Sequence, residues 1–132
     1  MTDHSVEVFC EESCGNAPKK LLLKDFTIAF ANNDYLYMEN HTTDDICWNI
    51  VGDKRIQGKE QFLKAAEQIK EQQVIELHIS NIITHGKLAA VNGRLNLEND
   101  ICYEICDIYL FSSSGKDAKI KEITSYIIKV FC

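Results

Sequence analysis

Residues Ile101–Phe111 read ICYEICDIYLF, and this stretch decides the fold. It is rich in isoleucine, tyrosine, phenylalanine and cysteine, which favour a half-buried strand, and the turn residues Ser112 to Gly115 end it. Because side chains alternate across a strand, one face carries a single carboxylate among apolar and aromatic residues: Ile101, Tyr103, Ile105, Asp107, Tyr109 and Phe111.

Asp107 is the residue of this strand that we single out as a candidate for chemistry. Both faces of the strand are mostly apolar, so we expect both to be covered. A buried lone carboxylate is costly, so its pKa should rise or a partner should satisfy it. Such a group is a candidate functional site. A purely structural hydrogen bond to a tyrosine, a histidine or a backbone N–H is the alternative.

Hydrophobic periodicity and turn residues predict the remaining elements. We expect a first helix that follows Asn16 as N-cap, has Pro18 in its first turn and runs to about Asn32. Further helices are expected at 35–40 and 59–72, and short strands at 46–51 and 54–57. Four long strands should follow as an antiparallel meander, at 74–85, 88–97, 101–111 and 119–131. The order predicts an α+β domain over 16–132, with helices on one face of a curved sheet and residues 1–15 as an N-terminal arm.

Composition narrows the range of partners. The chain has 132 residues, enough for one domain. Its 14 basic residues against 20 acidic ones give a net charge of −6, which argues against a nucleic-acid or anionic-membrane footprint. No apolar run approaches the roughly 20 residues of a membrane span. The N-terminus lacks the basic and apolar regions of a signal peptide, so we expect a cytoplasmic protein.

The six cysteines are expected to be free thiols in a reducing cytoplasm. Cys102 and Cys106 lie four residues apart on one strand face, about 13 Å at the usual rise, and cannot bridge each other. Cys10 and Cys14 could form half of a metal site, but no second Cys/His pair has zinc-ligand spacing, so no metal is expected. The sequence contains no phosphate loop or dinucleotide fingerprint, so no cofactor is expected either.

Four segments resemble one superfamily in their order and spacing. They are DDICWNIVG at 44–52, GKEQF at 58–62, AAVNG at 89–93, and the strand from Lys119 to Tyr126. Over about residues 18–131 the chain resembles the nuclear-transport-factor-two-like superfamily, which includes SnoaL-like polyketide cyclases and ketosteroid isomerase. The resemblance implies a cone-shaped barrel, in which a strongly curved, mostly antiparallel sheet wraps the N-terminal helices and leaves an apolar pocket. It also implies a homodimer through the outer sheet face.

The resemblance to ketosteroid isomerase implies roles for three residues. Asn49 matches the position of the catalytic base, Phe26 that of the oxyanion-hole tyrosine, and Asp107 that of the oxyanion-hole aspartate. Only the last is retained, and an asparagine cannot abstract a proton at neutral pH. In the epoxide-hydrolase branch an Arg-x-Asp is expected on one strand, where this chain has Arg94-Leu95-Asn96.

His78 offers a second route to acid–base chemistry. If its side chain faces the pocket, His78 could form with Asp107 a His–Asp acid–base couple similar to that of SnoaL-like cyclases. The sequence does not decide which face of the strand His78 occupies. The candidate catalytic residues are therefore Asp107 and His78, and the resemblance implies a pocket lined by Phe26, Phe30, Trp48, Asn49, Phe62, Tyr103, Tyr109 and Tyr126.

Three functions remain open at this point. The first is an isomerase, cyclase or hydrolase that acts on a small apolar substrate, with Asp107 as the acid or hydrogen-bond donor. The second is a small-molecule-binding domain without chemistry, which the change of two catalytic positions to Asn49 and Phe26 favours. The third is a protein-interaction module.

Overall fold

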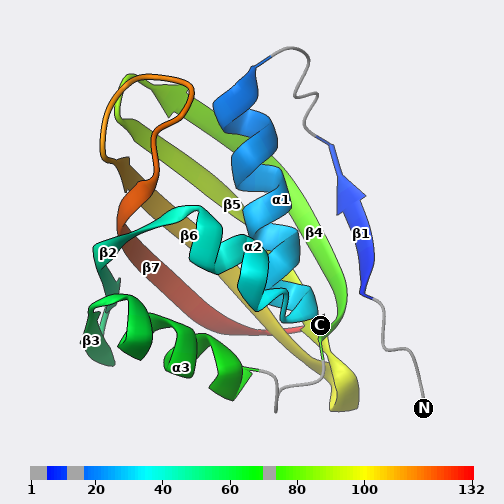
Figure 1. Cartoon of the computed structure of the whole chain (residues 1–132). Helices are drawn as coiled ribbons and strands as arrows, with labels where there is room; N and C mark the ends of the chain where they lie inside the picture. The colour runs from blue at the N-terminus through cyan, green and yellow to red at the C-terminus, as the bar shows by residue number, and fades with distance from the viewer. Residues whose placement is uncertain (1–5, 12–16, 70–73) are drawn as a thin grey trace.

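The computed structural model describes residues 6–11, 17–69 and 74–132 and shows a bent sheet whose concave face is covered by helices (Figure 1). Helix α1 (Pro18–Asn32) crosses this face, α2 (Tyr35–Asn40) follows it directly, and α3 (Lys59–Ile69) packs near the end of the sheet that carries β2 and β3. The α+β cone expected from the sequence is therefore confirmed.

The helix boundaries follow from capping residues. Proline occupies the first turn of α1, where its missing N–H costs nothing, and Asn33 ends the helix in the left-handed conformation. Asp34 then starts α2 by accepting a hydrogen bond from the backbone N–H of Tyr37. The structure gives Ala17 as the residue that precedes α1, and the predicted cap Asn16 lies outside the described residues, as do residues 70–72 of the predicted third helix.

The sheet has seven strands in the order β1-β4-β5-β6-β7-β2-β3 and does not close on itself within the described residues. Its strands are β1 (Glu7–Cys10), β2 (Thr42–Ile50), β3 (Lys54–Gln57), β4 (Val74–His85), β5 (Leu88–Leu97), β6 (Ile101–Phe111) and β7 (Ile120–Phe131). The four long strands form the predicted antiparallel meander, whereas β2 pairs in parallel with β7.

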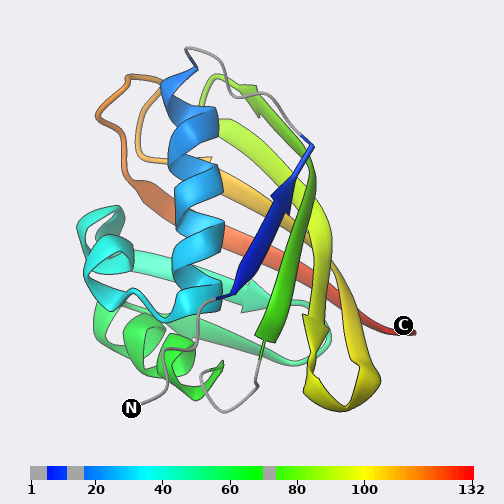
Figure 2. The same cartoon turned by 90° about the vertical axis from the view of Figure 1, so that its right-hand side faces the viewer.

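Two elements depart from the sequence prediction. Strand β2 begins at Thr42, four residues earlier than expected, because Thr42 already pairs with Ile120 of β7 before a register shift. Part of the N-terminal arm forms β1, which pairs in parallel with β4 at the sheet edge (Figure 2). The arm therefore extends the sheet.

Gly93 lies beside an irregularity in the pairing of β4 and β5. It pairs with Ile79 of β4, and the register between β4 and β5 shifts directly after this pair. A β-carbon added at Gly93 would collide with the backbone carbonyl oxygen of His78. The close approach of the two backbones therefore requires glycine at this position, as isolated strand glycines often indicate.

The expectation that all cysteines are free thiols is wrong for two of them. Cys102 and Cys132 form a disulfide, with Cα atoms 5.4 Å apart. The register of β6 and β7 pairs Cys102 with Val130, so the chain needs only two further residues to bring Cys132 beside it. Cys47 and Cys106 are free thiols, and Cys14 lies outside the described residues. No helix within the described segments is both long and apolar enough to cross a membrane.

Candidate functional site

An apolar chamber lies between helix α1 and the concave face of the sheet. Its volume is about 80 Å³, room for a few water molecules or one small chemical group. Its polar side chains come from three elements: Thr27 from α1, Asp107 and Tyr109 from β6, and Ser125 from β7. The rest of the lining is Phe30, Ala31, Trp48, Val74, Leu95, Ile105, Ile123 and Ile127.

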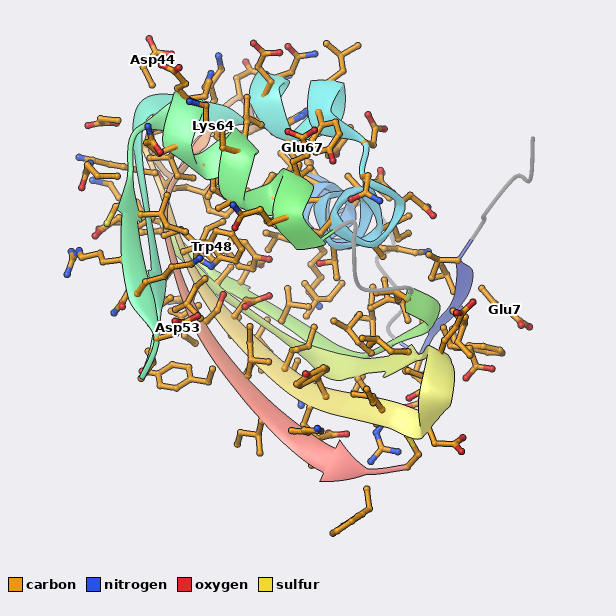
Figure 3. All side chains as sticks on the ribbon, turned by 90° about the horizontal axis from the view of Figure 1, so that it is seen from below. Glu7, Asp44, Trp48, Asp53, Lys64 and Glu67 are labelled. Carbon is orange, nitrogen blue, oxygen red and sulfur yellow. A yellow bond between two sulfur atoms is a disulfide. The ribbon has the colours of Figure 1, made fainter. Side chains whose placement is uncertain are left out.

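A wider vestibule adjoins the chamber. Its volume is about 460 Å³, and Trp48, Leu95 and Ile127 line both spaces. The β2–β3 turn, with Asp53 and Lys54, forms its polar rim together with α3. Figure 3 looks at this end of the molecule and shows Trp48 between α3 and the sheet, with Asp53 near the open edge. Chamber and vestibule form a funnel that narrows towards Asp107.

The carboxyl group of Asp107 faces the chamber, as the alternation of β6 predicted. Burial raises its pKa to about 6, and hydrogen bonds from Ser125 and Tyr109 oppose that rise without cancelling it. Asp107 therefore changes charge near neutral pH. Tyr109 is buried and its pKa lies well above the usual value, because burial and the neighbouring charge of Asp107 disfavour the phenolate.

Trp48 fixes the orientation of Ser125. The indole Nε1 of Trp48 donates a hydrogen bond of 2.9 Å to the Oγ of Ser125. The hydroxyl hydrogen of Ser125 is then available for Asp107, which lies directly opposite Ser125 in the register of β6 and β7. A hydrogen-bond chain thus runs from the indole through the serine to the carboxyl group.

Aromatic packing holds the indole in place. The ring of Trp48 meets those of Phe30 and Phe62 edge-on, with centroids 5.4 and 5.6 Å apart. Phe26 is fully buried behind this group and packs edge-on against Tyr109, at 6.1 Å between centroids. Such contacts orient the rings as well as burying them, so the chamber wall is fixed before any ligand enters.

Comparison with solved structures places this architecture among known folds. An NTF-2 like protein of unknown function from Burkholderia xenovorans LB400 superimposes with a TM-score of 0.72 at 16% identity, covering 91% of this chain and 90% of that one. A putative SnoaL-like polyketide cyclase from Shewanella denitrificans OS-217 gives 0.71 at 14% identity, covering 86% and 92%. A putative ketosteroid isomerase from Kribbella flavida DSM 17836 gives 0.65 at 13% identity, covering 87% and 81%.

The chain has the NTF2-like fold. No family model matches the sequence. No curated protein matches it significantly either. The likeness is therefore one of structure. The role of each predicted site residue in this NTF2-like fold has to be judged from its own position.

His78 does not form the predicted couple with Asp107. Leu77 and Ile79 on either side of it are buried, so His78 points to the outer face of the sheet. There its Nε2 lies 3.0 Å from Oε1 of Glu76, and its ring stacks on Phe9 of β1 with centroids 4.7 Å apart. The hydrogen bond from His78 is the main cause of the lowered pKa of Glu76.

Asn49 and Tyr126 also lie outside the chamber, contrary to prediction. Asn49 pairs with Thr124, while its neighbour Trp48 points inward, so the inward positions of β2 are those of Trp48 and Ile50. Tyr126 pairs with Cys106 on the outer face and is 47% exposed. In both cases the preceding residue, Trp48 or Ser125, is the one that lines the chamber.

The other predicted pocket residues divide between lining and support. Phe30, Trp48 and Tyr109 line the chamber, and Tyr103 lines the vestibule. Phe26 and Phe62 are fully buried core residues behind the wall.

A threonine occupies the helix position beside the predicted one. Thr27, next to Phe26, is the residue of α1 that brings a hydroxyl group to the chamber beside Tyr109. In this NTF2-like chain the phenol therefore comes from β6 and the helix contributes a hydroxyl.

Sequence reasoning missed Thr27 and Ser125. Ser125 could have been found, because pairing the two antiparallel strands of nearly equal length across their connecting loop sets it opposite Asp107. The epoxide-hydrolase positions Arg94 and Asn96 face outward, where Arg94 pairs with Glu104. Within the described parts of the chain no three His, Cys, Asp or Glu side chains gather as metal ligands would.

Proposed function

We propose that the chain binds a compact apolar molecule, places its one polar group beside Asp107, and exchanges a proton with it. The observation that carries this proposal is a carboxyl group with a pKa of about 6 that faces a mostly apolar chamber, in which the other polar side chains are uncharged hydroxyls, with an open vestibule beside it. General acids and bases work best with a pKa near the working pH. At pH 7 about one tenth of such a group is protonated, so both forms are populated.

The shape of the funnel supports a ligand class. The narrow chamber suits a carbonyl or hydroxyl group and the carbon atoms around it, and the vestibule suits the body of the molecule. Isomerisation or cyclisation of such a molecule requires a proton to move between carbon or oxygen atoms. The names of the similarly folded putative polyketide cyclase and putative ketosteroid isomerase agree with such chemistry, although a fold alone carries no function.

The test uses 3-cyclohexen-1-one, a compact apolar ketone. Its isomerisation to the conjugated 2-cyclohexen-1-one needs one proton removed and one returned, and the product absorbs in the ultraviolet. The wild-type protein should accelerate this reaction, and Asp107→Asn should lower the rate by about 100-fold or more, the usual contribution of a general acid or base. Asp117→Asn, on an exposed loop, is the matched control. Equal rates in all three proteins would contradict the enzymatic proposal.

A non-catalytic binding role is the second candidate. Two observations favour it: Asp107 is the only carboxyl group among the described residues that line the chamber, and Asn49 lies on the other face. Trp48 is the single tryptophan of the sequence and lines both spaces, so its fluorescence reports ligand entry. Saturable quenching by cyclohexanol or cyclohexanone, together with no isomerisation of 3-cyclohexen-1-one, would select this role.

We also propose that two copies associate through the outer sheet face. Apolar side chains adjoin one another there, because Ile83, Ala90 and Ile108 follow in register across β4, β5 and β6. Leu88 and Tyr126 lie beside them, and Ile83, Leu88 and Tyr126 are 63%, 55% and 47% exposed. An exposed apolar area of this kind on a soluble domain is typical of a contact surface.

A further inference from the structure

The funnel is polar at both ends and apolar in the middle. Strand β6 shows this order on its inward face, where Asp107, Ile105 and Tyr103 follow one another at every second position. Asp107 lines the chamber, whereas Tyr103 lines the vestibule. At the usual rise of a strand, the Cα atoms of these two residues are about 13 Å apart. One strand therefore carries a polar side chain at each end of the cavity.

Apolar side chains from neighbouring strands form the middle of the funnel. Leu95 lies opposite Tyr103 in the register of β5 and β6, and Ile127 lies opposite Ile105 in that of β6 and β7. Leu95, Ile127 and the ring of Trp48 line both spaces, and the indole Nε1 of Trp48 already donates to Ser125. A polar ligand atom placed here would lose its contact with water without gaining a partner, which costs free energy.

Tyr103 offers a hydroxyl group at the outer end of this apolar passage. Its ring is half-buried and packs against the hydrophobic core, which fixes the side chain. No hydrogen bond to another described residue occupies its hydroxyl, which can donate one hydrogen and accept another. The charged residues of the vestibule lining, Asp53 and Lys54, have opposite signs. This end of the funnel therefore suits an uncharged hydroxyl or carbonyl group.

We propose that Tyr103 binds a second polar group of the ligand, so that the ligand class is an elongated apolar molecule with an uncharged oxygen at each end. The inference rests on the proposed function, in which the first polar group lies beside Asp107. Tyr103 then selects ligands by length as well as by polarity. An oxygen too close to the first one lies against Leu95 and Ile127 and gains no partner.

The experiment compares two pairs of ketones, and the members of each pair differ by one hydroxyl group. The long pair is 4-cyclohexylcyclohexanone and 4-(trans-4-hydroxycyclohexyl)cyclohexanone, whose two linked rings hold the oxygens at opposite ends. The short pair is cyclohexanone and 4-hydroxycyclohexanone. Dissociation constants are measured on the full chain by quenching of Trp48, the single tryptophan of the sequence.

In the wild type the hydroxyl group should tighten binding within the long pair and not within the short pair. The expected gain is about three- to tenfold, which is what one net hydrogen bond of ordinary strength gives. Tyr103→Phe removes the hydroxyl and keeps the ring, so this gain should disappear while the affinity for 4-cyclohexylcyclohexanone stays the same. Tyr126→Phe is the matched control on the outer sheet face and should keep the full gain.

Three outcomes would overturn the inference. The first is an equal affinity for both long ketones in the wild type, which is decisive even if Tyr103→Phe does not fold. The second is a gain that persists in Tyr103→Phe, because another rim residue such as Gln68 would then bind the hydroxyl. The third is an equal gain in the short pair, because Tyr103 would then not select by length.

These measurements also separate the inference from the proposed function. Binding of both long ketones with no preference for the hydroxyl would refute the role of Tyr103 and leave the proposed binding of apolar molecules intact. A clear preference together with no isomerisation of 3-cyclohexen-1-one would support the role of Tyr103 and refute proton exchange. Failure of every ketone to bind would contradict both.

Discussion

Trp48 and Ser125 are 77 positions apart in the sequence, yet the indole Nε1 of one donates a hydrogen bond of 2.9 Å to the hydroxyl oxygen of the other. The bond is possible because β2 inserts beside β7 as a parallel neighbour, which brings the ring of Trp48 over the inward-facing Ser125. It directs the serine hydrogen towards Asp107. The indole therefore influences the charge of a carboxyl group through an intermediate hydroxyl.

Removal of either donor should raise the pKa of Asp107. Ser125→Ala deletes a hydrogen bond to the carboxylate, and Trp48→Phe leaves the serine free to turn away. Hydrogen bonds to charged groups contribute about 1.5–3 kcal/mol, so a rise of the pKa by about one to two units is expected for Ser125→Ala and a smaller rise for Trp48→Phe. Carboxyl NMR titration measures both. Phe30→Leu, which removes a lining ring without a hydrogen bond, is the control, and an unchanged pKa in Ser125→Ala would refute the assignment.

The raised pKa of Asp107 also predicts a pH-dependent stability. A carboxyl group whose pKa is about 6 when folded and about 3.9 when unfolded favours folding while it is neutral. That stability is fully present below about pH 4 and is lost as the pH rises through about 6. Asp107→Asn mimics the neutral form, so it should be more stable than the wild type at pH 8, by at most about 3 kcal/mol.

Urea unfolding at pH 4, 6 and 8 measures this difference. The gain in the free energy of unfolding should be largest at pH 8 and should shrink steadily towards pH 4. Asp117→Asn, at an exposed position, should follow the wild type throughout. A gain that is the same at every pH would mean that Asp107 does not titrate as described.

Local patterns in the sequence were sufficient for most of the fold. Strands β4, β5 and β6 begin and end where turn residues and alternation predicted, and Asp107 faces inward as alternation required. These properties depend on neighbours along the chain, which a sequence displays directly. The same is true of α1, which has its proline in the first turn and ends before Asn33 as predicted.

The site itself depended on pairings between distant segments. Asn49 was assigned to the chamber because the resemblance matched it to the catalytic base. A match that is one residue out moves a strand residue to the other face, and the inward residues proved to be Trp48 and Ile50. Whether His78 faced inward was left open for the same reason. The partner of Cys102 became visible only when the register of β6 and β7 was known.

Gly93→Ala should destabilise the fold strongly. The added β-carbon would meet the backbone of His78 and Ile79, which cannot move aside as a flexible side chain does. Overpacking usually costs about 1–3 kcal/mol, and we expect the upper end of that range. Chemical denaturation measures it, with Gly115→Ala as the control, because a β-carbon there makes only an ordinary contact with Ser113. Equal losses in both variants would contradict the close approach.

The proposed association through the outer sheet face predicts a charge-sensitive dimer. Ile108→Lys places an ammonium group in the middle of the apolar surface formed with Ile83 and Leu88. Sedimentation velocity should show a dimer for the wild type and a monomer for this variant. Leu36→Lys is the control, since Leu36 is 67% exposed on helix α2, away from the sheet. A wild-type monomer at all concentrations would exclude the dimer.

The disulfide predicts a stability that depends on reducing agent. Cys102 and Cys132 close a loop with a sequence separation of 30, for which loss of chain entropy in the unfolded state gives an upper limit of about 4 kcal/mol. Cys132→Ser should lower the free energy of unfolding by up to that amount, and reductant should lower it equally in the wild type. Cys106→Ser, which changes a free thiol on the same strand face, should keep the sensitivity to reductant. If reductant destabilised Cys132→Ser as much as the wild type, the stabilising bond would not be the one between Cys102 and Cys132.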